Sequence, residues 1–78
     1  MNEHLAFAQC LQRVLNETEL TATEVARRLE MRSRNSIFRI LKGKTSPQLN
    51  RRFLENFHKQ MGEQLTEAQW AALNRALE

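Results

Sequence analysis

Apolar residues recur every three or four positions along most of this 78-residue chain, and no stretch alternates between apolar and polar residues. The first pattern puts apolar side chains on one face of a helix, whereas the strands of a half-buried sheet need alternation. Tyr is absent and Val and Ile are few, which also disfavours strands. The sequence therefore predicts an all-α fold.

Start and stop signals divide the chain into five short helices. Two capping boxes, TATE at 21–24 and TEAQ at 66–69, each place Thr at a helix start and Glu or Gln three residues later. The other signals are Ser caps, a first-turn Pro and closing glycines, namely Ser33, Gly43, Ser46, Pro47 and Gly62. We expect helices over about 3–15, from 21, over 33–43, over 47–62 and over 66–78.

The apolar faces of these helices are expected to form one core, and residues 1–78 one domain. The expected core residues are Leu5, Ala8, Leu11, Val14 and Leu15, with Phe7 beside them; Val25, Ala26 and Leu29; Ile37, Ile40 and Leu41; Leu49, Phe53, Leu54, Phe57 and Met61; and Trp70, Leu73 and Leu77. The single cysteine, Cys10, lies in an apolar helical stretch, so we interpret it as a small core residue.

The net charge of +3 is unevenly distributed. Residues 27–52 contain nine basic residues and one acid, Glu30, a net charge of +8, whereas the rest of the chain carries −5. A concentrated basic block is typical of proteins that bind a polyanion. A solvated helical surface is the alternative. Arg51 and Arg52 fit either interpretation.

The expected helix over 33–43 has two different faces. On a helical wheel, Ile40 and Leu41 fall within about 60° of Ile37. Asn35, Arg39 and Lys42 fall about 140–200° away, on the opposite side. One face can therefore pack on neighbouring helices while the other can enter a DNA major groove. Phe38 falls between them, at the core edge or as a contact to a thymine methyl group.

Catalytic and metal-binding functions find little support. His4 and His58 lie at opposite ends of the chain, without Cys or carboxylate at ligand spacing. There is no Gly-rich phosphate loop, and Ser36 has no neighbouring base. We expect no enzyme activity, metal, cofactor or small-molecule ligand. No membrane span or secretory signal is evident, which predicts a cytoplasmic protein. Nucleoid association follows from the expected DNA binding.

The segment TATEVARRLEMRSRNSIFRILKGKTSP resembles the Cro and phage-repressor (XRE-type) helix-turn-helix family. Members typically have a Leu-Ala or Val-Ala pair, then an Ile or Val, then a Gly shortly before a Pro; here these are Val25, Ala26, Ile37, Gly43 and Pro47. The resemblance covers about residues 11–58.

Two features depart from the family pattern. Glu30 stands where the family usually has Gly, and the spacing from Val25 to Ile37 is one residue longer than usual. Both suggest a slightly extended turn between two helices that would otherwise be joined by about three residues.

The resemblance implies a lambda-repressor-like domain with the helix-turn-helix over about 21–43 and a recognition helix over about 33–42. It implies a sequence-specific DNA-binding domain of a bacterial or phage transcriptional regulator, such as a repressor, acting on double-stranded DNA as a homodimer. Residues 63–78, with the last helix over about 66–78, are the candidate for dimer contacts. The alternatives are an antitoxin, the N-terminal part of a larger regulator, or a protein-interaction module with a basic docking face.

Roles follow for individual side chains. Those near the start and on the outer face of the recognition helix are expected to meet base edges: Arg34, Asn35, Ser36 and Arg39. Those at helix ends and in the turns are expected to contact phosphates: Thr21, Thr23, Arg32, Lys42, Lys44 and Thr45.

Overall fold

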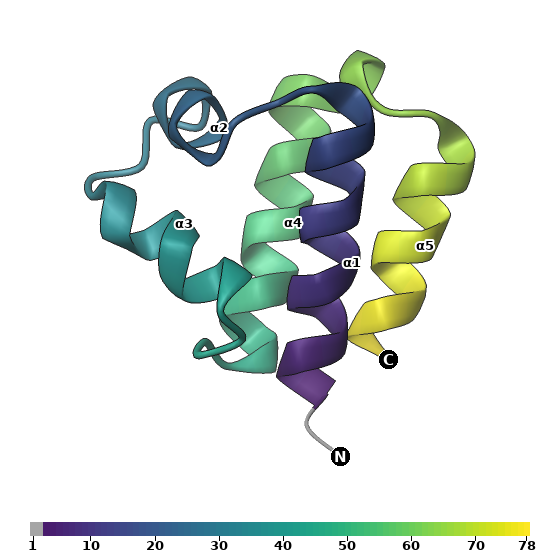
Figure 1. The fold of residues 1–78 in the computed structure, drawn as a ribbon, viewed down its shortest axis with the longest axis horizontal. Helices are drawn as coiled ribbons and strands as arrows, with labels where there is room; N and C mark the ends of the chain where they lie inside the picture. The colour runs from purple at the N-terminus through teal and green to yellow at the C-terminus, as the bar shows by residue number, and fades with distance from the viewer. Residues whose placement is uncertain (1–2) are drawn as a thin grey trace.

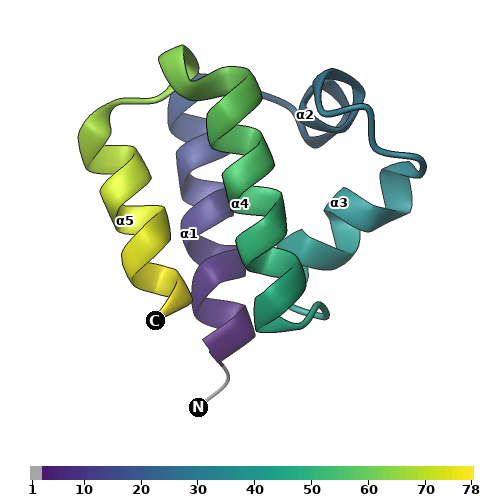
Figure 2. The ribbon, with the colours of Figure 1, turned by 180° about the vertical axis from the view of Figure 1, so that it is seen from behind.

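The computed structural model describes residues 3–78 and their side chains except those of residues 3, 4 and 34. This part of the chain forms five α-helices and no strand, which confirms the all-α prediction. The helices are α1 (Glu3–Thr18), α2 (Ala22–Arg28), α3 (Arg34–Leu41), α4 (Pro47–Met61) and α5 (Glu67–Leu77), with a 3₁₀ turn at Gly62–Gln64. Figures 1 and 2 show α4, α1 and α5 side by side, with α2 and α3 set against one flank of this layer.

A single core joins all five helices. Helix α1 lies at its centre and packs against α5, α3 and α4, while α2 packs against α3. Leu11, Val25, Ile37, Phe53 and Phe57 are all buried in one cluster, as expected. Burial of each such side chain stabilises the fold by about 1.5–3 kcal/mol.

Two expected core residues are exposed, and the prediction was wrong for both. Leu5 is 44% exposed and Leu49 52% exposed. Each lies about 100–120° from the centre of its helix's buried face. Phe7, expected only beside the core, is fully buried, and Asn50 occupies the position on α4 that Leu49 was expected to fill.

Residues at the margin of the core behave in two ways. Leu41 and Leu77 are half-buried against it. Phe38, expected either at the core edge or as an outward apolar contact, is 42% exposed. Cys10 is also half-buried against the core. Burial raises the pKa of the Cys10 thiol; Arg13 partly opposes this and Glu17 adds to it. The thiol therefore stays protonated, as suits a packing residue.

The predicted helix starts are confirmed by the caps. The hydroxyls of Thr21, Ser33, Ser46 and Thr66 each accept a hydrogen bond from a first-turn backbone N–H. Only the second capping box is reciprocal: Gln69 Oε1 accepts from the Thr66 backbone N–H at 2.8 Å. In the first, the Glu24 carboxylate lies 3.6 Å from the Arg28 guanidinium.

Helices α1, α2 and α3 end in the same way. Glu19, Glu30 and Gly43 have positive φ angles of 59°, 54° and 73°. The next backbone N–H then donates to a carbonyl five residues back, in each case at 2.9–3.0 Å, which is the Schellman motif. Gly43 thus ends α3 as predicted. The turn between α2 and α3 covers residues 29–33 and is longer than the three residues expected. It contains both the Schellman motif at Glu30, which ends α2, and the Ser33 cap, which begins α3.

Two other helix ends differ from expectation. Helix α1 continues past residue 15 to Thr18, whose hydroxyl donates to the Val14 carbonyl at 2.8 Å. Helix α4 runs on from Met61 into the 3₁₀ turn instead of closing at Gly62, whose φ is −56°. The Trp70 indole N–H donates to the Gly62 carbonyl at 2.9 Å and so provides that carbonyl with a partner.

Replacing Glu30 by Gly should stabilise the protein. A left-handed conformation costs an L-residue about 1–2 kcal/mol, and the greater freedom of unfolded Gly offsets part of the gain. We expect Glu30→Gly to raise the free energy of unfolding by about 0.5–1 kcal/mol in urea titrations. Glu55→Gly, at an exposed position inside α4, should lower it by a similar amount. Destabilisation by Glu30→Gly would contradict the strain assigned to this turn.

Candidate nucleic-acid interface

Helix α3 is fixed to the rest of the protein by one face. Ile37 is fully buried and Ile40 is 5% exposed. At the end of the helix, Gln12 Nε2 on α1 donates to the Leu41 carbonyl at 2.6 Å. The opposite face of α3 is therefore held outward, and the expectation of one packed and one exposed face is confirmed.

Three of the four residues expected at base edges have described side chains, and all three are exposed. Asn35, Ser36 and Arg39 lie on α3, with Lys42 as its C-terminal cap residue. Arg34 is the first residue of α3, and its side chain lies outside the described set. Phe38 is exposed next to this face and adds an apolar contact surface to it.

The residues expected at phosphates are distributed over three segments. Thr21 and Thr23 are exposed at the start of α2, where the Thr21 hydroxyl already accepts from the Glu24 N–H. Arg32 is exposed in the turn before α3. Lys42 and Lys44 are exposed at and just after the end of α3.

Thr45 lies differently from the other expected phosphate contacts. It is only 9% exposed, and its hydroxyl donates to Asn50 Oδ1 on α4. Asn50 itself is 1% exposed. The pair ties the loop after α3 to the start of α4, so Thr45 positions the loop that carries Lys44 and is removed from the set of candidate contacts.

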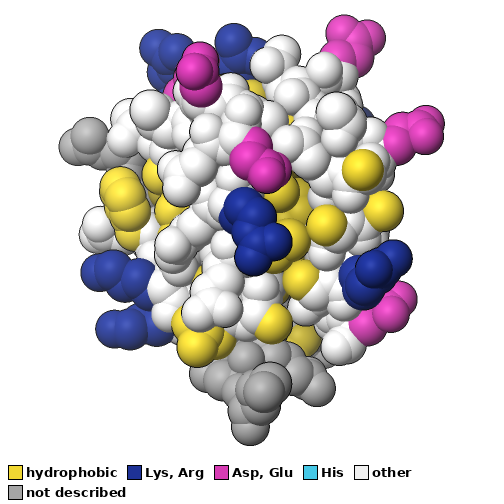
Figure 3. Space-filling view, turned by 45° about the vertical axis from the view of Figure 1, so that its right-hand side comes forward, with side chains coloured by type: hydrophobic (Ala, Val, Ile, Leu, Met, Phe, Trp, Pro, Cys, Tyr) yellow, Lys and Arg dark blue, Asp and Glu magenta, His cyan; other side chains and the backbone are white. Residues whose placement is uncertain are grey.

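The segment from the turn before α3 to the middle of α4 carries charge of one sign. Residues 31–54 contain seven Lys or Arg residues and no acid. The one ion pair found among the described side chains, Arg28 with Glu24, lies within α2. By contrast, the face in Figure 3, on the side of the molecule that carries α5, has acidic and basic side chains interspersed. Positive charge is therefore concentrated in the segment that contains α3 and the first turns of α4.

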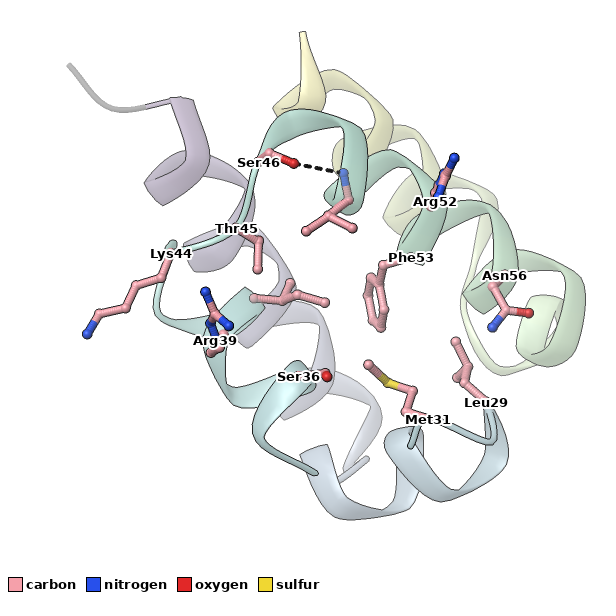
Figure 4. Close-up of a pocket in the computed structure, with 12 residues that line it drawn as sticks. Leu29, Met31, Ser36, Arg39, Lys44, Thr45, Ser46, Arg52, Phe53 and Asn56 are labelled. Carbon is pink, nitrogen blue, oxygen red and sulfur yellow. Dashed lines mark hydrogen bonds between the residues drawn. The ribbon is translucent and has the colours of Figure 1, made fainter. Parts of the chain in front are cut away.

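Two further residues belong to this surface: Arg52, which fitted either interpretation of the basic block, and Leu49, which was expected in the core. Both lie on the first half of α4 and line, together with Ser36 and Arg39, a groove of about 510 Å³ (Figure 4). The helical wheel of α4 puts Leu49 off the buried face, and the charge of Arg52 within the basic block is the sequence signal for that residue. Arg51, next to Arg52, faces a different hollow, beside Leu54 and His58.

The buried pair Thr45–Asn50 should be energetically coupled. Asn50→Ala leaves the Thr45 hydroxyl buried without its partner, which should cost about 1–3 kcal/mol of stability. Thr45→Val should cost a similar amount because it leaves the buried Asn50 Oδ1 without its hydrogen-bond donor. Urea titrations of the double variant should show a loss smaller than the sum of the two single losses by about 1 kcal/mol. Strict additivity would mean that the pair does not hold the loop.

Within residues 3–78, none of the helices combines the length and apolar character needed to span a membrane. Nor do three or more His, Cys, Asp or Glu side chains come together as a metal site among the described residues. No protein-family model matches the chain, and neither a curated protein nor a solved structure does.

Proposed function

We propose that this protein binds double-stranded DNA in a sequence-specific manner, as the DNA-binding domain of a bacterial or phage transcriptional regulator. In this proposal α2 and α3 are a helix-turn-helix of the Cro and phage-repressor type. The observation that carries it is α3 itself: Ile37 and Ile40 anchor the helix, and Asn35, Ser36 and Arg39 project from its other side.

Helix α3 would lie in the major groove, which admits one α-helix. Arg39 suits a bidentate contact to guanine and Asn35 a bidentate contact to adenine. Ser36 can bond a base edge or a phosphate, and the exposed Phe38 ring suits a thymine methyl group. Arg34 begins the helix and would join these residues at the bases.

Phosphate contacts would set the position of α3 without reading sequence. Lys42 is the C-terminal cap residue of α3, Lys44 follows it, and Arg32 precedes the Ser33 cap at the start of the helix. The hydroxyls of Thr21 and Thr23 would add contacts at the start of α2. The Thr45–Asn50 hydrogen bond supports this arrangement because it fixes the loop that carries Lys44.

One helix reads few base pairs, so we propose that two copies bind paired half-sites about one helical turn apart. Helix α5 packs against α1 on one side and leaves Ala68, Ala71 and Ala72 exposed on the other. This outer side of α5 is the proposed dimer contact. An antitoxin or a part of a larger regulator would use the same α3 surface.

The decisive experiment is selection of bound sequences from a random duplex pool. An enriched motif with two related halves supports the proposal. Enrichment of no motif, despite tight binding, would overturn it in favour of a basic surface that docks an acidic protein or binds DNA without preference.

Variants should separate the residues that read bases from those that hold phosphates. Removing a base-contacting side chain should cost about 1–3 kcal/mol and relax preference at one base pair, whereas removing a phosphate contact weakens all sites alike. We therefore expect Arg39→Ala and Asn35→Ala to flatten positions of the selected motif. Lys44→Ala should lower affinity and leave the motif intact. Thermal melts should stay near wild type because all three side chains are exposed. An unchanged motif in the folded Arg39→Ala and Asn35→Ala proteins would contradict the placement of α3.

A further inference from the structure

The groove between α3 and α4 has an apolar floor and basic walls. Its volume is about 510 Å³, within the range of small-molecule sites. Met31, Ile40, Leu49 and Phe53 supply apolar surface, and Figure 4 shows Met31 and Phe53 directed into the space. Arg39 from α3 and Arg52 from α4 stand on its two sides, Lys44 also lines it, and none of the described residues that line it is acidic.

We propose that this groove binds a small anionic amphiphile, a carboxylate with an apolar body of the fatty-acid kind. The guanidinium of Arg forms a planar fork of donors that matches a carboxylate. An apolar body would cover the floor, of which Leu49 is 52% exposed to water. The three positive charges of Arg39, Lys44 and Arg52 favour an anionic ligand over a neutral one and repel a cationic one.

The ligand would compete with DNA. Arg39 belongs both to the groove and to the surface proposed to read bases, so it cannot serve a bound carboxylate and a guanine at once. This part of the inference rests on the proposed function, whereas ligand binding itself does not. Because coupling is reciprocal, the duplex should lower the affinity for the ligand by the same factor.

Decanoate is a suitable probe, below its micellar concentration and without DNA present. The methyl groups of ¹³C-labelled methionines supply the readout: Met31 lines the groove, whereas Met61 is 2% exposed in the core and is absent from the groove. We expect a saturable shift of the Met31 signal and a nearly unchanged Met61 signal. Two control ligands should leave the Met31 signal unchanged. Acetate has the carboxylate but no alkyl chain, and decyltrimethylammonium has the alkyl chain but a positive charge.

Arg52→Ala and Arg51→Ala form a matched pair, since both side chains are exposed on α4 and only Arg52 lines the groove. Arg52→Ala should weaken decanoate binding about tenfold or more, as expected for loss of a charged hydrogen bond. Arg51→Ala should change it less than about twofold. Leu49→Ser should also weaken it and, at an exposed position, keep the fold.

Several results would overturn the inference. These are an unmoved Met31 signal, an equal response to decyltrimethylammonium, or equal losses from Arg52→Ala and Arg51→Ala. If a Glu- and Leu-rich peptide shifts the Met31 signal and decanoate does not, the groove binds a protein segment and the small-ligand proposal is wrong. If decanoate binds but leaves the affinity for a selected duplex unchanged, the competition is refuted. If no duplex is preferred while decanoate still binds, the proposed function fails and the groove site stands.

Discussion

Ile37→Ala is expected to lower the free energy of unfolding by about 2–5 kcal/mol. Ile37 is fully buried and is one of the largest buried side chains of the protein. Its removal loses the transfer free energy of the deleted carbons and leaves a cavity where α3 meets α1 and α2. Because small domains are stabilised by only about 5–15 kcal/mol, this is a large share of the total.

The adjacent Phe38→Ala supplies the control. Phe38 is 42% exposed, so its truncation should change stability far less, by about 0.5 kcal/mol. Urea titrations followed by circular dichroism would measure both, with the slope of the transition checked for constancy so that the change reflects stability alone. Equal losses from the two substitutions, or none from Ile37→Ala, would mean that α3 is not anchored through this face.

The helix starts were predictable from the sequence because their determinants are local. A Ser or Thr cap bonds a backbone N–H two or three residues ahead, so Thr21, Ser33, Ser46 and Thr66 carry their own signal. The stop at Gly43 is equally local, since a positive φ favours Gly. Glu30 has the same positive φ, but a Glu residue does not predict that conformation. The sequence indicated it only because Glu30 stands where the family usually has Gly.

Residue-level burial was predicted less well on α1 and α4. Leu5 and Leu49 are apolar, but they lie off the buried face, and Phe7 and Asn50 lie on it. Assigning burial by residue type favours Leu over Asn. Asn50 is nevertheless buried because Thr45, five residues earlier, provides a hydrogen-bond partner in the interior. A pair formed between a loop and a helix depends on tertiary placement, which no pattern along one helix reveals.

For the candidate site, the sequence predicted which side of α3 is exposed, because periodicity fixes a helix's two faces. The base and phosphate roles of individual side chains stay predictions. The groove was not predicted at all, since its walls come from the turn after α2, from α3 and from α4. Its existence depends on how far α3 and α4 stand apart, which is decided by the packing of α3 on α1 and α2.

Salt should weaken DNA binding strongly. The net charge of +8 over residues 27–52 suggests on the order of five phosphates neutralised per protomer, with a slope of about −0.9 per phosphate in a plot of log affinity against log salt. A slope near −4.5 corresponds to a roughly 500-fold loss of affinity when salt rises from about 50 to about 200 mM. Fluorescence anisotropy with a selected duplex at several salt concentrations would measure it.

Two variants assign this slope to the α3 side. Lys44→Ala removes a cation just beyond the end of α3 and should shallow the slope by about one unit. Arg75→Ala removes a cation that is also exposed, from α5 on the opposite flank of the helix layer, and should leave the slope unchanged. The comparison separates a local contact from net charge, because both variants lose one positive charge. Equal changes in the two slopes would show that overall charge governs binding, and a nearly flat slope for the wild-type protein would remove the electrostatic basis for placing DNA against α3.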